Sequence, residues 1–514
     1  MSKTIIIIGA GLAGLSAALQ AAENGCNVKL VSSLPSERAQ SVMAEGGINA
    51  ALNTKDENDS PEEHFTDTIK AACGLADPNA VWGMTQAAPE LVHWLLKLGV
   101  KFNMSGYDDV DLRNFGGQKK KRTAFAQSDT GKQIMTAMID AVRRKEASGM
   151  VERFSHHSFL TLRLCGNICC GCVIRDEYSQ ETVELPGDAV IVATGGMHGL
   201  FGNTTGSLSN TGEVTAELFR LGVPLANGEM IQYHPTTVKC GGKRMLISEA
   251  ARGEGGRLFA MKDGKQWYFM EEKYPELGNL MPRDITAREI WKVSHESEVF
   301  LDMTEISEEI ISNKLSGLAD DCMTYLHKDI RKEPVSVLPG IHYFMGGILV
   351  DEQHRTPIQN LYAAGECCAQ YHGANRLGGN SLLGALYGGR VAAKSACEQA
   401  DVVDLSCATQ IDFPPASQIS EIKQLNKVMQ ETMGVVRNEN TLLNGIQTVQ
   451  VLTGNLPLLG MAVLKSALAR KESRGAHWRE DYPKSNDDDY LKTTVARFDG
   501  KQIQISFVPV PERR

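Results

Sequence analysis

Thr4-Ile-Ile-Ile-Ile-Gly9-Ala-Gly11-Leu-Ala-Gly14 lies at the start of the chain and decides its fold. The β-branched run predicts a buried parallel strand, and the glycines after it form a G-x-G-x-x-G pattern. Residues 15–23 are typical of a helix, and residues 28–31 of the next strand. Because such glycines let a pyrophosphate approach a helix N-terminus closely, the unit predicts a Rossmann-like dinucleotide-binding domain.

The residues around this unit refine the prediction. The acidic residue that usually follows the second strand is absent, and Ser32 and Ser33 stand in its place, so a hydroxyl must contact any ribose. Residues 5–22 are uncharged, but the glycines favour a strand and a helix over a signal peptide or a membrane span. No other uncharged run approaches membrane-spanning length, so work at a membrane would require another subunit.

The composition is that of a soluble globular protein. The 514 residues are 42% hydrophobic and 22% charged, and this length predicts roughly two to four domains. The net charge of −9 argues against nucleic acid as a main partner. Nothing marks secretion, so the twelve cysteines are expected to be reduced thiols. The cluster from Cys165 to Cys172 could hold a metal, but the strand-like flanks around a Gly166-Asn167 turn favour a β-hairpin and no metal site.

Two later segments also run from a strand into glycine. Residues 189–196, AVIVATGG, and residues 361–366, LYAAGE, repeat the pattern far along the chain. Strands that end in glycine at three separated points suggest one ligand held by a discontinuous domain. The more polar segment 234–340 is then an insertion. Beyond residue 415, apolar residues recur at helical spacing, and residues 493–510 alternate as two short strands.

Ser248-Glu-Ala-Ala-Arg252-Gly-Glu254-Gly-Gly256 places two carboxylates and a guanidinium on a glycine-broken backbone. Charges are costly to bury unpaired, so this stretch is either a solvated loop or a site. Four other glycine- or proline-marked segments carry polar groups, and the cationic candidates are His234, Arg252, Arg283, His342 and Arg376. Because arginine binds carboxylates bidentately, this set predicts a site for a small dicarboxylate.

The order of the motifs resembles that of one family. GAGLAG, AEGGINA, ATGG, QYHPT, SEAARGEGG, PRD, HYFMGG, AAGE and HGANRLGGNSLL follow one another from Gly9 onward, and RGAHWREDYP ends at Pro483. Over nearly its whole length the chain resembles flavoprotein subunits of the succinate dehydrogenase/fumarate reductase family. The resemblance implies an α/β fold with a discontinuous Rossmann-like FAD-binding domain (1–233 and 341–410), an inserted α+β capping domain (234–340) and a C-terminal helical domain with short tail strands (415–514).

The resemblance also implies roles for single residues. Arg283 would donate or accept the proton at the substrate carbon, and Arg252 and Glu254 would relay protons to it. The residues expected to bind or adjoin the dicarboxylate are His234, Ser248, Glu249, His342, Arg376 and Phe115. Ser248 stands where the family usually has threonine, and both offer a hydroxyl. The residues expected to contact FAD are Gly9, Gly11, Gly14, Ser32, Gln40, Ser41, Gly46, Gly47, Glu213, Glu366, Ser381 and Leu382. Glu213 stands where an aspartate is usual.

One position departs from the pattern of many membrane-bound relatives. Those proteins attach FAD covalently through a histidine, and Gln40 occupies that position here. An amide cannot form the bond, so FAD is expected to be noncovalent. Because the histidyl bond raises the flavin potential in such relatives, its absence favours fumarate reduction over succinate oxidation.

Other functions compete with the interconversion of fumarate and succinate. L-Aspartate oxidase shares the fold, noncovalent FAD and most anion-binding residues, but Met345 stands where that group tends to have cysteine. The AEGG and AAGECC segments also look more like those of the reductases. Urocanate- or acrylate-type reductases need not bind two carboxylates, whereas this chain has both His342 and Arg376. A non-enzymatic electron-relay flavoprotein would not need the full charged set.

The resemblance also bears on partners. The chain carries no iron–sulfur cysteine motif and no CxxCH haem motif, so its electrons are expected to come from an iron–sulfur subunit. Beyond that subunit would lie a membrane anchor or a thiol-oxidising partner. Lys119-Lys-Lys-Arg122 is interpreted as a solvated loop, with docking of an acidic partner as the alternative. The expected location is the cytoplasm, including the cytoplasmic face of a membrane through partner subunits.

Overall fold

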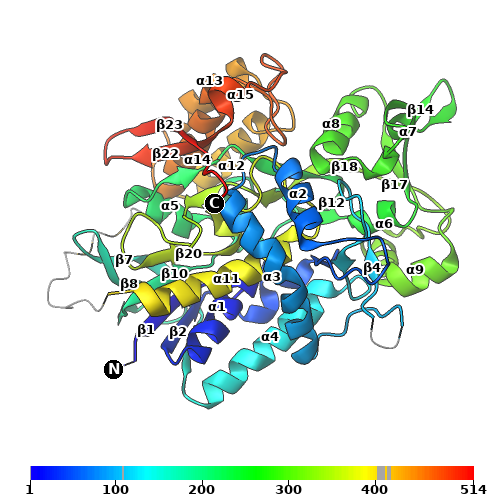
Figure 1. Ribbon diagram of the computed structural model, residues 1–514. Coiled ribbons are helices and arrows are strands. Elements are labelled where there is room, and N and C mark those ends of the chain that lie inside the picture. Colours follow the sequence, from blue (N-terminus) through cyan, green and yellow to red (C-terminus); the bar gives the residue numbers. More distant parts are fainter. Residues whose placement is uncertain (1, 107–108, 402–410, 412, 414–417) are drawn as a thin grey trace.

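A five-stranded parallel sheet forms the centre of the larger domain (Figure 1). The computed structural model describes residues 2–106, 109–401, 411, 413 and 418–514. In sheet order the strands are β20 (Leu361–Ala363), β10 (Ala189–Val192), β1 (Thr4–Ile8), β2 (Asn27–Ser32) and β6 (Val151–Ser155). They come from widely separated parts of the chain, which confirms the predicted discontinuous domain.

Helices cover one face of this sheet. They are α1 (Leu12–Glu23), α3 (Pro78–Lys97), α4 (Thr130–Ala147) and α11 (Asn380–Gln399), and Figure 1 shows α1 beside α11. Ile5 and Ile7 belong to the core on the helical side, whereas Ile6 and Ile8 belong to the core on the opposite side. Side chains alternate along a strand, so a sheet covered on both faces requires the unbroken apolar run at residues 5–8.

A small antiparallel sheet covers the opposite face. It consists of β7 (His157–Cys165), β8 (Ile168–Asp176) and β9 (Thr182–Pro186), and Gly166 turns between the first two strands at φ +60°. The predicted hairpin is confirmed, and Cys169 and Cys172 are buried in the core that it shares with the parallel sheet. Cys165 is disulfide-bonded, whereas the other described cysteines are free thiols. The expectation of reduced thiols is therefore wrong at Cys165, because spacing along a chain does not show which distant cysteine the fold brings near.

The segment between β12 (Ile231–Cys240) and β18 (Leu338–Phe344) builds the α+β cap, drawn in green in Figure 1. Its strands are β14 (Arg257–Lys262), β15 (Lys265–Trp267), β16 (Val299–Asp302) and β17 (Val335–Ser336). Its helices are α6 (Glu249–Gly253), α7 (Phe269–Lys273), α8 (Arg283–Val293), α9 (Glu308–Lys314) and α10 (Ser316–Asp321). β12 pairs with both β18 and β13 (Lys243–Leu246). The predicted boundaries at 233/234 and 340/341 fall inside β12 and β18, and they stay predictions.

The C-terminal region is helical, as expected. Helices α12 (Ile419–Thr432), α13 (Glu439–Val449) and α14 (Asn455–Ala469) share one apolar core. The predicted limits at residues 410 and 415 lie outside the described residues. The tail forms the short helix α15 (Asp487–Tyr490) and a hairpin of β22 (Lys492–Phe498) and β23 (Ile503–Pro509). This hairpin extends a sheet made by β21 (Cys368–Ala369), β19 (Gly347–Leu349) and β11 (Leu225–Ala226), so the tail strands are joined to the larger domain.

Shorter elements complete the larger domain. They are β3 (Ile48–Asn49), α2 (Pro61–Ala71), β4 (Leu112–Arg113), β5 (Thr123–Ala124) and α5 (Glu213–Arg220). In the part of the chain that the structure describes, no helix combines the length and the apolarity needed to cross a membrane.

Candidate active site

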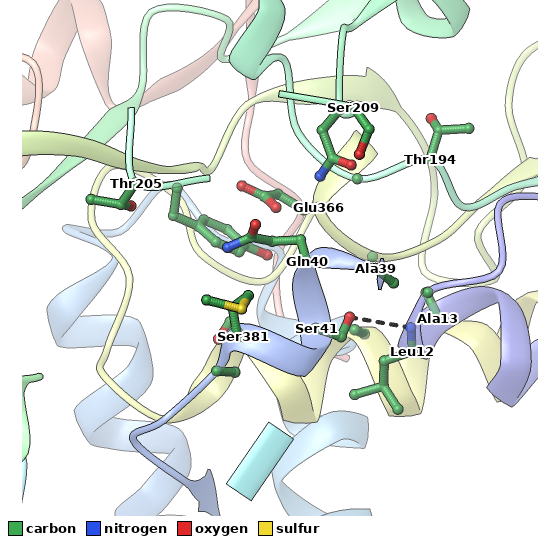
Figure 2. Close-up of a pocket in the computed structure, with 18 of the residues that line it drawn as sticks. Leu12, Ala13, Ala39, Gln40, Ser41, Thr194, Thr205, Ser209, Glu366 and Ser381 are labelled. Atoms are coloured by element: carbon green, nitrogen blue, oxygen red, sulfur yellow. Dashed lines mark hydrogen bonds between the residues drawn. The ribbon is translucent and has the colours of Figure 1, made fainter. Parts of the chain in front are cut away.

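A cavity of about 500 Å³ extends from the turn between β1 and α1 to the cap. Most of the residues predicted for the two sites line it. The exceptions are Gly14, Arg252 and Glu254. The two predicted sites are therefore two ends of one space, part of which is drawn in Figure 2.

The glycine turn closes one end of the cavity. Gly9 has φ +110°, and a Cβ there would lie 2.3 Å from the carbonyl oxygen of Ala193. A Cβ on Gly14 would lie 1.8 Å from the carbonyl oxygen of Gly9. A Cβ on Gly11 would instead meet only ordinary contacts, the nearest at 3.6 Å from Ser41 Oγ. The fold itself requires Gly9 and Gly14, whereas Gly11 leaves space beside the helix N-terminus for a ligand.

Ser32 ends β2 and lines the same end of the cavity. Its Oγ is buried and has no hydrogen-bond partner among the residues that the structure describes. A buried hydroxyl without a partner is destabilising, and a ribose hydroxyl would satisfy it. The glycine turn and this hydroxyl together fit the dinucleotide part of FAD.

Gln40 and Ser41 begin a short 3₁₀ turn over the middle of the cavity. Ser41 Oγ accepts a hydrogen bond from the backbone N–H of Leu12 at 3.2 Å, which ties this turn to the start of α1. Gln40 and Glu366 both line the cavity, and Figure 2 labels their side chains. Glu366 accepts a hydrogen bond from the backbone N–H of Phe344 at 3.1 Å. The remaining predicted cofactor residues that line the cavity are Gly46, Gly47, Glu213, Ser381 and Leu382.

Glu249 joins two arginines at the other end of the cavity. Arg283 Nη2 and Nε donate to Glu249 Oε2 at 2.5 and 2.8 Å. Glu249 Oε1 accepts from Arg252 Nη2 at 3.3 Å and from the backbone N–H of Gly116 at 3.1 Å. Burial favours the neutral acid, but the two arginines and these hydrogen bonds outweigh it and lower the pKa of Glu249. Glu249 is therefore ionised and shared between both guanidinium groups.

Glu254 lies outside this arrangement. Its Oε2 accepts from Lys314 Nζ at 3.1 Å, and no recorded contact joins Glu254 to Arg252 or Arg283 within the described ranges. In an α-helix, a side chain five positions further along the chain points about 140° away around the helix axis. The short α6 therefore presents Glu249 and Arg252 to each other, whereas Glu254 follows the end of the helix and contacts Lys314 instead.

Arg376 is buried without a carboxylate partner. Its side chain is 3% exposed, and no ion pair to it is recorded among the described residues. The guanidinium carbon lies 4.2 Å from the centre of the Tyr343 ring. Burial and the nearby Arg283 lower the pKa of Arg376 to about 9. Arg376 still carries its charge at pH 7, and Glu366 and Glu249 act on it without forming an ion pair with it among the described residues.

His234 and His342 lie beside each other, with ring centres 5.1 Å apart. His342 Nδ1 is 2.8 Å from Thr205 Oγ1, and His234 Nδ1 is 3.1 Å from the carbonyl oxygen of Thr236. Burial and the nearby Arg283 lower the pKa of both rings well below the usual range. Both histidines are therefore neutral at pH 7, so each ring has one N–H donor and one acceptor nitrogen.

Two further predicted residues, Ser248 and Phe115, line the cavity. Ser248 lines the cavity and caps α6, its hydroxyl accepting from the backbone N–H of Ala250 at 3.4 Å. Phe115 is buried, and its ring lies against Gly46 and Gly378, where a Cβ would approach it to 2.7 and 3.0 Å. Phe115 therefore lies between the cofactor end and the substrate end.

The sequence did not predict Gln232 and Tyr343 as site residues, although both lie in quoted motifs. Gln232 Oε1 accepts from Arg283 Nη1 at 3.1 Å, and Gln232 Nε2 donates to the carbonyl oxygen of Arg376 at 2.8 Å. Tyr343 lines the cavity and contacts Arg376. Both residues lie close to a predicted site histidine, His234 in QYHPT and His342 in HYFMGG, and this could have indicated a place in the site. The direction of each side chain, however, depends on strand register.

The charges at this end of the cavity do not balance. Arg252, Arg283 and Arg376 carry three positive charges, Glu249 carries one negative charge, and the two histidines are neutral. Among these six side chains, two positive charges therefore remain in excess, and the carboxyl group of Glu366 also acts on Arg376 from the cofactor end. Uncompensated buried charge is unfavourable, and a small dianion with two carboxylates would neutralise it.

Comparisons with known proteins agree with this geometry. A family profile described as "FAD binding domain" matches residues 4–382, and one described as "Fumarate reductase flavoprotein C-term" matches residues 451–513. The succinate dehydrogenase flavoprotein subunit of Bacillus subtilis is 38% identical, across 100% of this chain and 98% of its own length.

Two further relatives show the same relationship. The 8-methylmenaquinol:fumarate reductase flavoprotein subunit of Wolinella succinogenes is 32% identical, across 100% of this chain and 92% of its own. A solved chain of an E. coli quinol fumarate reductase matches with a TM-score of 0.90 at 27% identity, covering 99% of this chain and 97% of that one. The glycine turn, the buried arginines and matches that span the whole chain lead to one conclusion: this chain belongs to the family of succinate dehydrogenase/fumarate reductase flavoprotein subunits, which are FAD-binding oxidoreductases.

Proposed function

We propose that this chain interconverts fumarate and succinate with noncovalently held FAD, and that it favours fumarate reduction. The observation that carries the proposal is the pair of unbalanced positive charges left by Arg252, Arg283 and Arg376 around Glu249. Fumarate and succinate are dicarboxylate dianions and would balance these charges. The cavity also places this site next to a dinucleotide-binding turn.

Substrate binding falls to four residues that line the cavity. His234, Ser248, His342 and Arg376 are proposed to hold the two carboxylates. The cationic Arg376 pairs with one of these carboxylates. Bound FAD supplies the hydride for one substrate carbon. The protein must then deliver a proton to the other carbon.

Arg283 is proposed to deliver that proton, and its contacts support a refilling route. Glu249 Oε2 lies 2.5 Å from Arg283 Nη2, so the carboxylate can pass on to Arg283 a proton that it takes up from Arg252. Arg252 contacts the other oxygen of the same carboxylate at 3.3 Å. The proposed order is Arg252, Glu249, Arg283, substrate. Glu254 was predicted as a relay residue, and its contact with Lys314 supports only a place farther out.

Noncovalent attachment and the direction of the reaction rest on Gln40. Its side chain lies within the cavity but is an amide, which cannot form the histidyl bond. The relatives are named for both directions, so their names do not decide between them. After acid precipitation of the holoprotein, the flavin should appear in the supernatant. Flavin retained in the pellet would contradict noncovalent binding.

Electron supply is proposed to come from an iron–sulfur subunit, with a membrane anchor or a thiol-oxidising subunit beyond it. The relatives named here are themselves described as subunits. A cytoplasmic location, peripheral to the membrane through such partners, is part of this proposal. Purification of the native complex under mild conditions tests it, and a chain that purifies alone and reduces fumarate with a cellular donor would contradict it.

The activity is tested by two assays on the same FAD-loaded protein. Fumarate should be reduced by a reduced dye, and L-aspartate should not produce hydrogen peroxide. Arg283→Ala should lose fumarate turnover and keep its FAD. Peroxide formation without fumarate turnover would favour the oxidase, and an active Arg283→Ala variant would overturn the proton-transfer role.

A further inference from the structure

Gln232 and Tyr343 form a cross-strand pair between the two arginines that face the ligand. β12 and β18 are antiparallel neighbours, and Gln232 lies directly opposite Tyr343 in their ladder. Opposite residues direct their side chains to the same face of a sheet. On that face they meet Arg283, which begins α8 in the cap, and Arg376, which precedes α11 in the larger domain.

Tyr343 takes the place of a counter-ion for Arg376. The buried guanidinium lies 4.2 Å from the ring centre, which is within the range of a cation–π contact. Tyr343 is itself held in place, because His372 packs edge-on against its ring at 5.3 Å between ring centres. A ring face stabilises the charge without occupying the N–H groups of Arg376. Those groups remain available for a carboxylate.

Gln232 joins the same two arginines through its amide. Oε1 accepts from Arg283 Nη1 at 3.1 Å. Nε2 donates to the carbonyl oxygen of Arg376 at 2.8 Å and to Asn375 Oδ1 at 3.0 Å. The side chain is fully buried, so these bonds are not shared with bulk water. A carboxylate at this position would cancel one of the two unbalanced charges, whereas the amide orients Arg283 without changing them.

We propose that Gln232 and Tyr343 are positioning residues. They hold the Arg283 and Arg376 side chains in place and leave the two excess positive charges unneutralised. The inference rests on the proposed function, because it concerns the affinity for a dicarboxylate. It predicts different kinetic effects for the two residues. Tyr343 acts on a group that binds substrate and transition state alike, so its loss should raise KM. Gln232 also contacts the proposed proton donor, so its loss should lower kcat as well.

The experiment compares Tyr343→Leu, Tyr343→Phe and Gln232→Met in the FAD-loaded protein. Tyr178→Leu is the matched control, because Tyr178 is 78% exposed and lies in the β8–β9 turn, away from the cavity lining. Malonate binding is measured from the flavin absorbance, and fumarate reduction from steady-state rates with a reduced dye. FAD content is recorded for each variant.

Tyr343→Leu should raise the Kd for malonate and the KM for fumarate about tenfold, with kcat within about twofold of wild type. Tyr343→Phe, which keeps the ring face, should stay within about threefold of wild type. Gln232→Met should raise KM and lower kcat about tenfold or more. Tyr178→Leu should match wild type.

The outcomes separate this inference from the proposed function. Wild-type protein that neither binds malonate nor reduces fumarate would overturn the proposed function, and the inference with it. Wild-type protein that does both, together with a Tyr343→Leu variant indistinguishable from Tyr178→Leu, would overturn the inference alone. If Tyr343→Leu loses its FAD, Gln232→Met decides, and unchanged KM and kcat would then overturn the inference.

Discussion

Glu249, Arg252 and Arg283 form the part of the site where individual residues decide the chemistry. One carboxylate is shared by two guanidinium groups, and its two oxygens have different partners. The carboxylate is therefore held ionised next to the proposed proton donor. Glu254 has the same side chain but pairs with Lys314, outside the cavity lining. Position on a short helix, rather than residue type, separates these two glutamates.

Glu249→Gln should lower kcat by about 10²-fold to 10³-fold, because Arg283 loses the group that returns its proton. The KM for fumarate should not rise, since the amide leaves the site more positive. Steady-state rates with a reduced dye measure both constants. Glu254→Gln is the matched control and should stay within about threefold of wild type. A Glu254→Gln variant as slow as Glu249→Gln would restore the relay role predicted from the sequence.

At the scale of elements, the turn between β1 and α1 shows that glycines within one motif have different tasks. Gly14 lets α1 pack against the turn, since a Cβ there would overlap the carbonyl oxygen of Gly9 at 1.8 Å. An added Cβ on Gly11 would make only ordinary van der Waals contacts in the protein itself. The fold itself therefore requires glycine at position 14, whereas glycine at position 11 is required only when a pyrophosphate is bound.

Gly14→Ala and Gly11→Ala should therefore fail in different ways. Gly14→Ala should lower Tm and FAD content together, because the backbone must shift to relieve the overlap. Gly11→Ala should fold with a Tm near that of the FAD-free wild type and bind FAD weakly. Thermal melts and the ratio of flavin to protein check both. Gly242→Ala is the control, since nothing lies within 4 Å of its added Cβ. Normal FAD content in Gly11→Ala would contradict this interpretation of the cavity.

At the scale of the whole molecule, a buried ionic cluster joins the C-terminal region to the larger domain. Arg470 Nε donates to Glu229 Oε1 at 2.7 Å, and Arg470 Nη1 donates to Glu472 Oε1 at 2.8 Å. Arg470 also donates to Thr494 Oγ1 at 2.7 Å in the tail strand β22. All three side chains of the ion pairs are fully buried. The larger domain, the helical region and the tail hairpin are therefore held by one residue.

Arg470→Met should destabilise the protein by about 3–5 kcal/mol, because two buried carboxylates lose a partner. The decrease should appear in equilibrium urea unfolding of the FAD-loaded protein. Lys471→Met, at the exposed neighbouring position, should change the free energy of unfolding by less than about 0.5 kcal/mol. Equal stability of the two variants would show that the cluster does not join these parts.

Stability should also fall as the pH drops from 7.5 to 5.5. Burial lowers the pKa of His64 to about 3 and of His354 to about 4, and it lowers the pKa of four others well below the usual range: His234, His342, His372 and His477. Below about pH 6.5 the unfolded chain binds protons on these rings and the folded chain does not. Each ring therefore lowers the free energy of unfolding by about 1.4 kcal/mol for each pH unit that the pH falls.

Glu45 acts in the opposite sense, because burial raises its pKa to about 8 and the folded state then binds the proton more tightly. Burial also raises the pKa of Asp59, Glu213, Asp284 and Asp321, so these acids act with Glu45, and the six histidines outnumber them. The Tm of the FAD-loaded protein, measured without dicarboxylate, should therefore decrease steadily toward pH 5.5. A Tm that rises or stays constant would contradict the neutral state of the buried histidines.

Local patterns in the sequence were enough to predict the parallel strands, the glycine turn and the C-terminal helices, and to identify the charged candidates. These features depend on periodicity and on backbone conformations that neighbouring residues impose. The family motifs placed the same residues in two sites, and the cavity brings nearly all of them together.

The tertiary structure alone decided which charged groups meet. It paired Glu249, and not Glu254, with Arg283, left Arg376 without a counter-ion, and put Gln232 and Tyr343 between the two arginines. It also joined the tail hairpin to a sheet of the larger domain. Such contacts depend on helix phase, strand register and long-range packing, and residues far apart in a chain carry no local record of them. The sequence thus determined which groups are present, and their packing determined the charge that the site offers to a ligand.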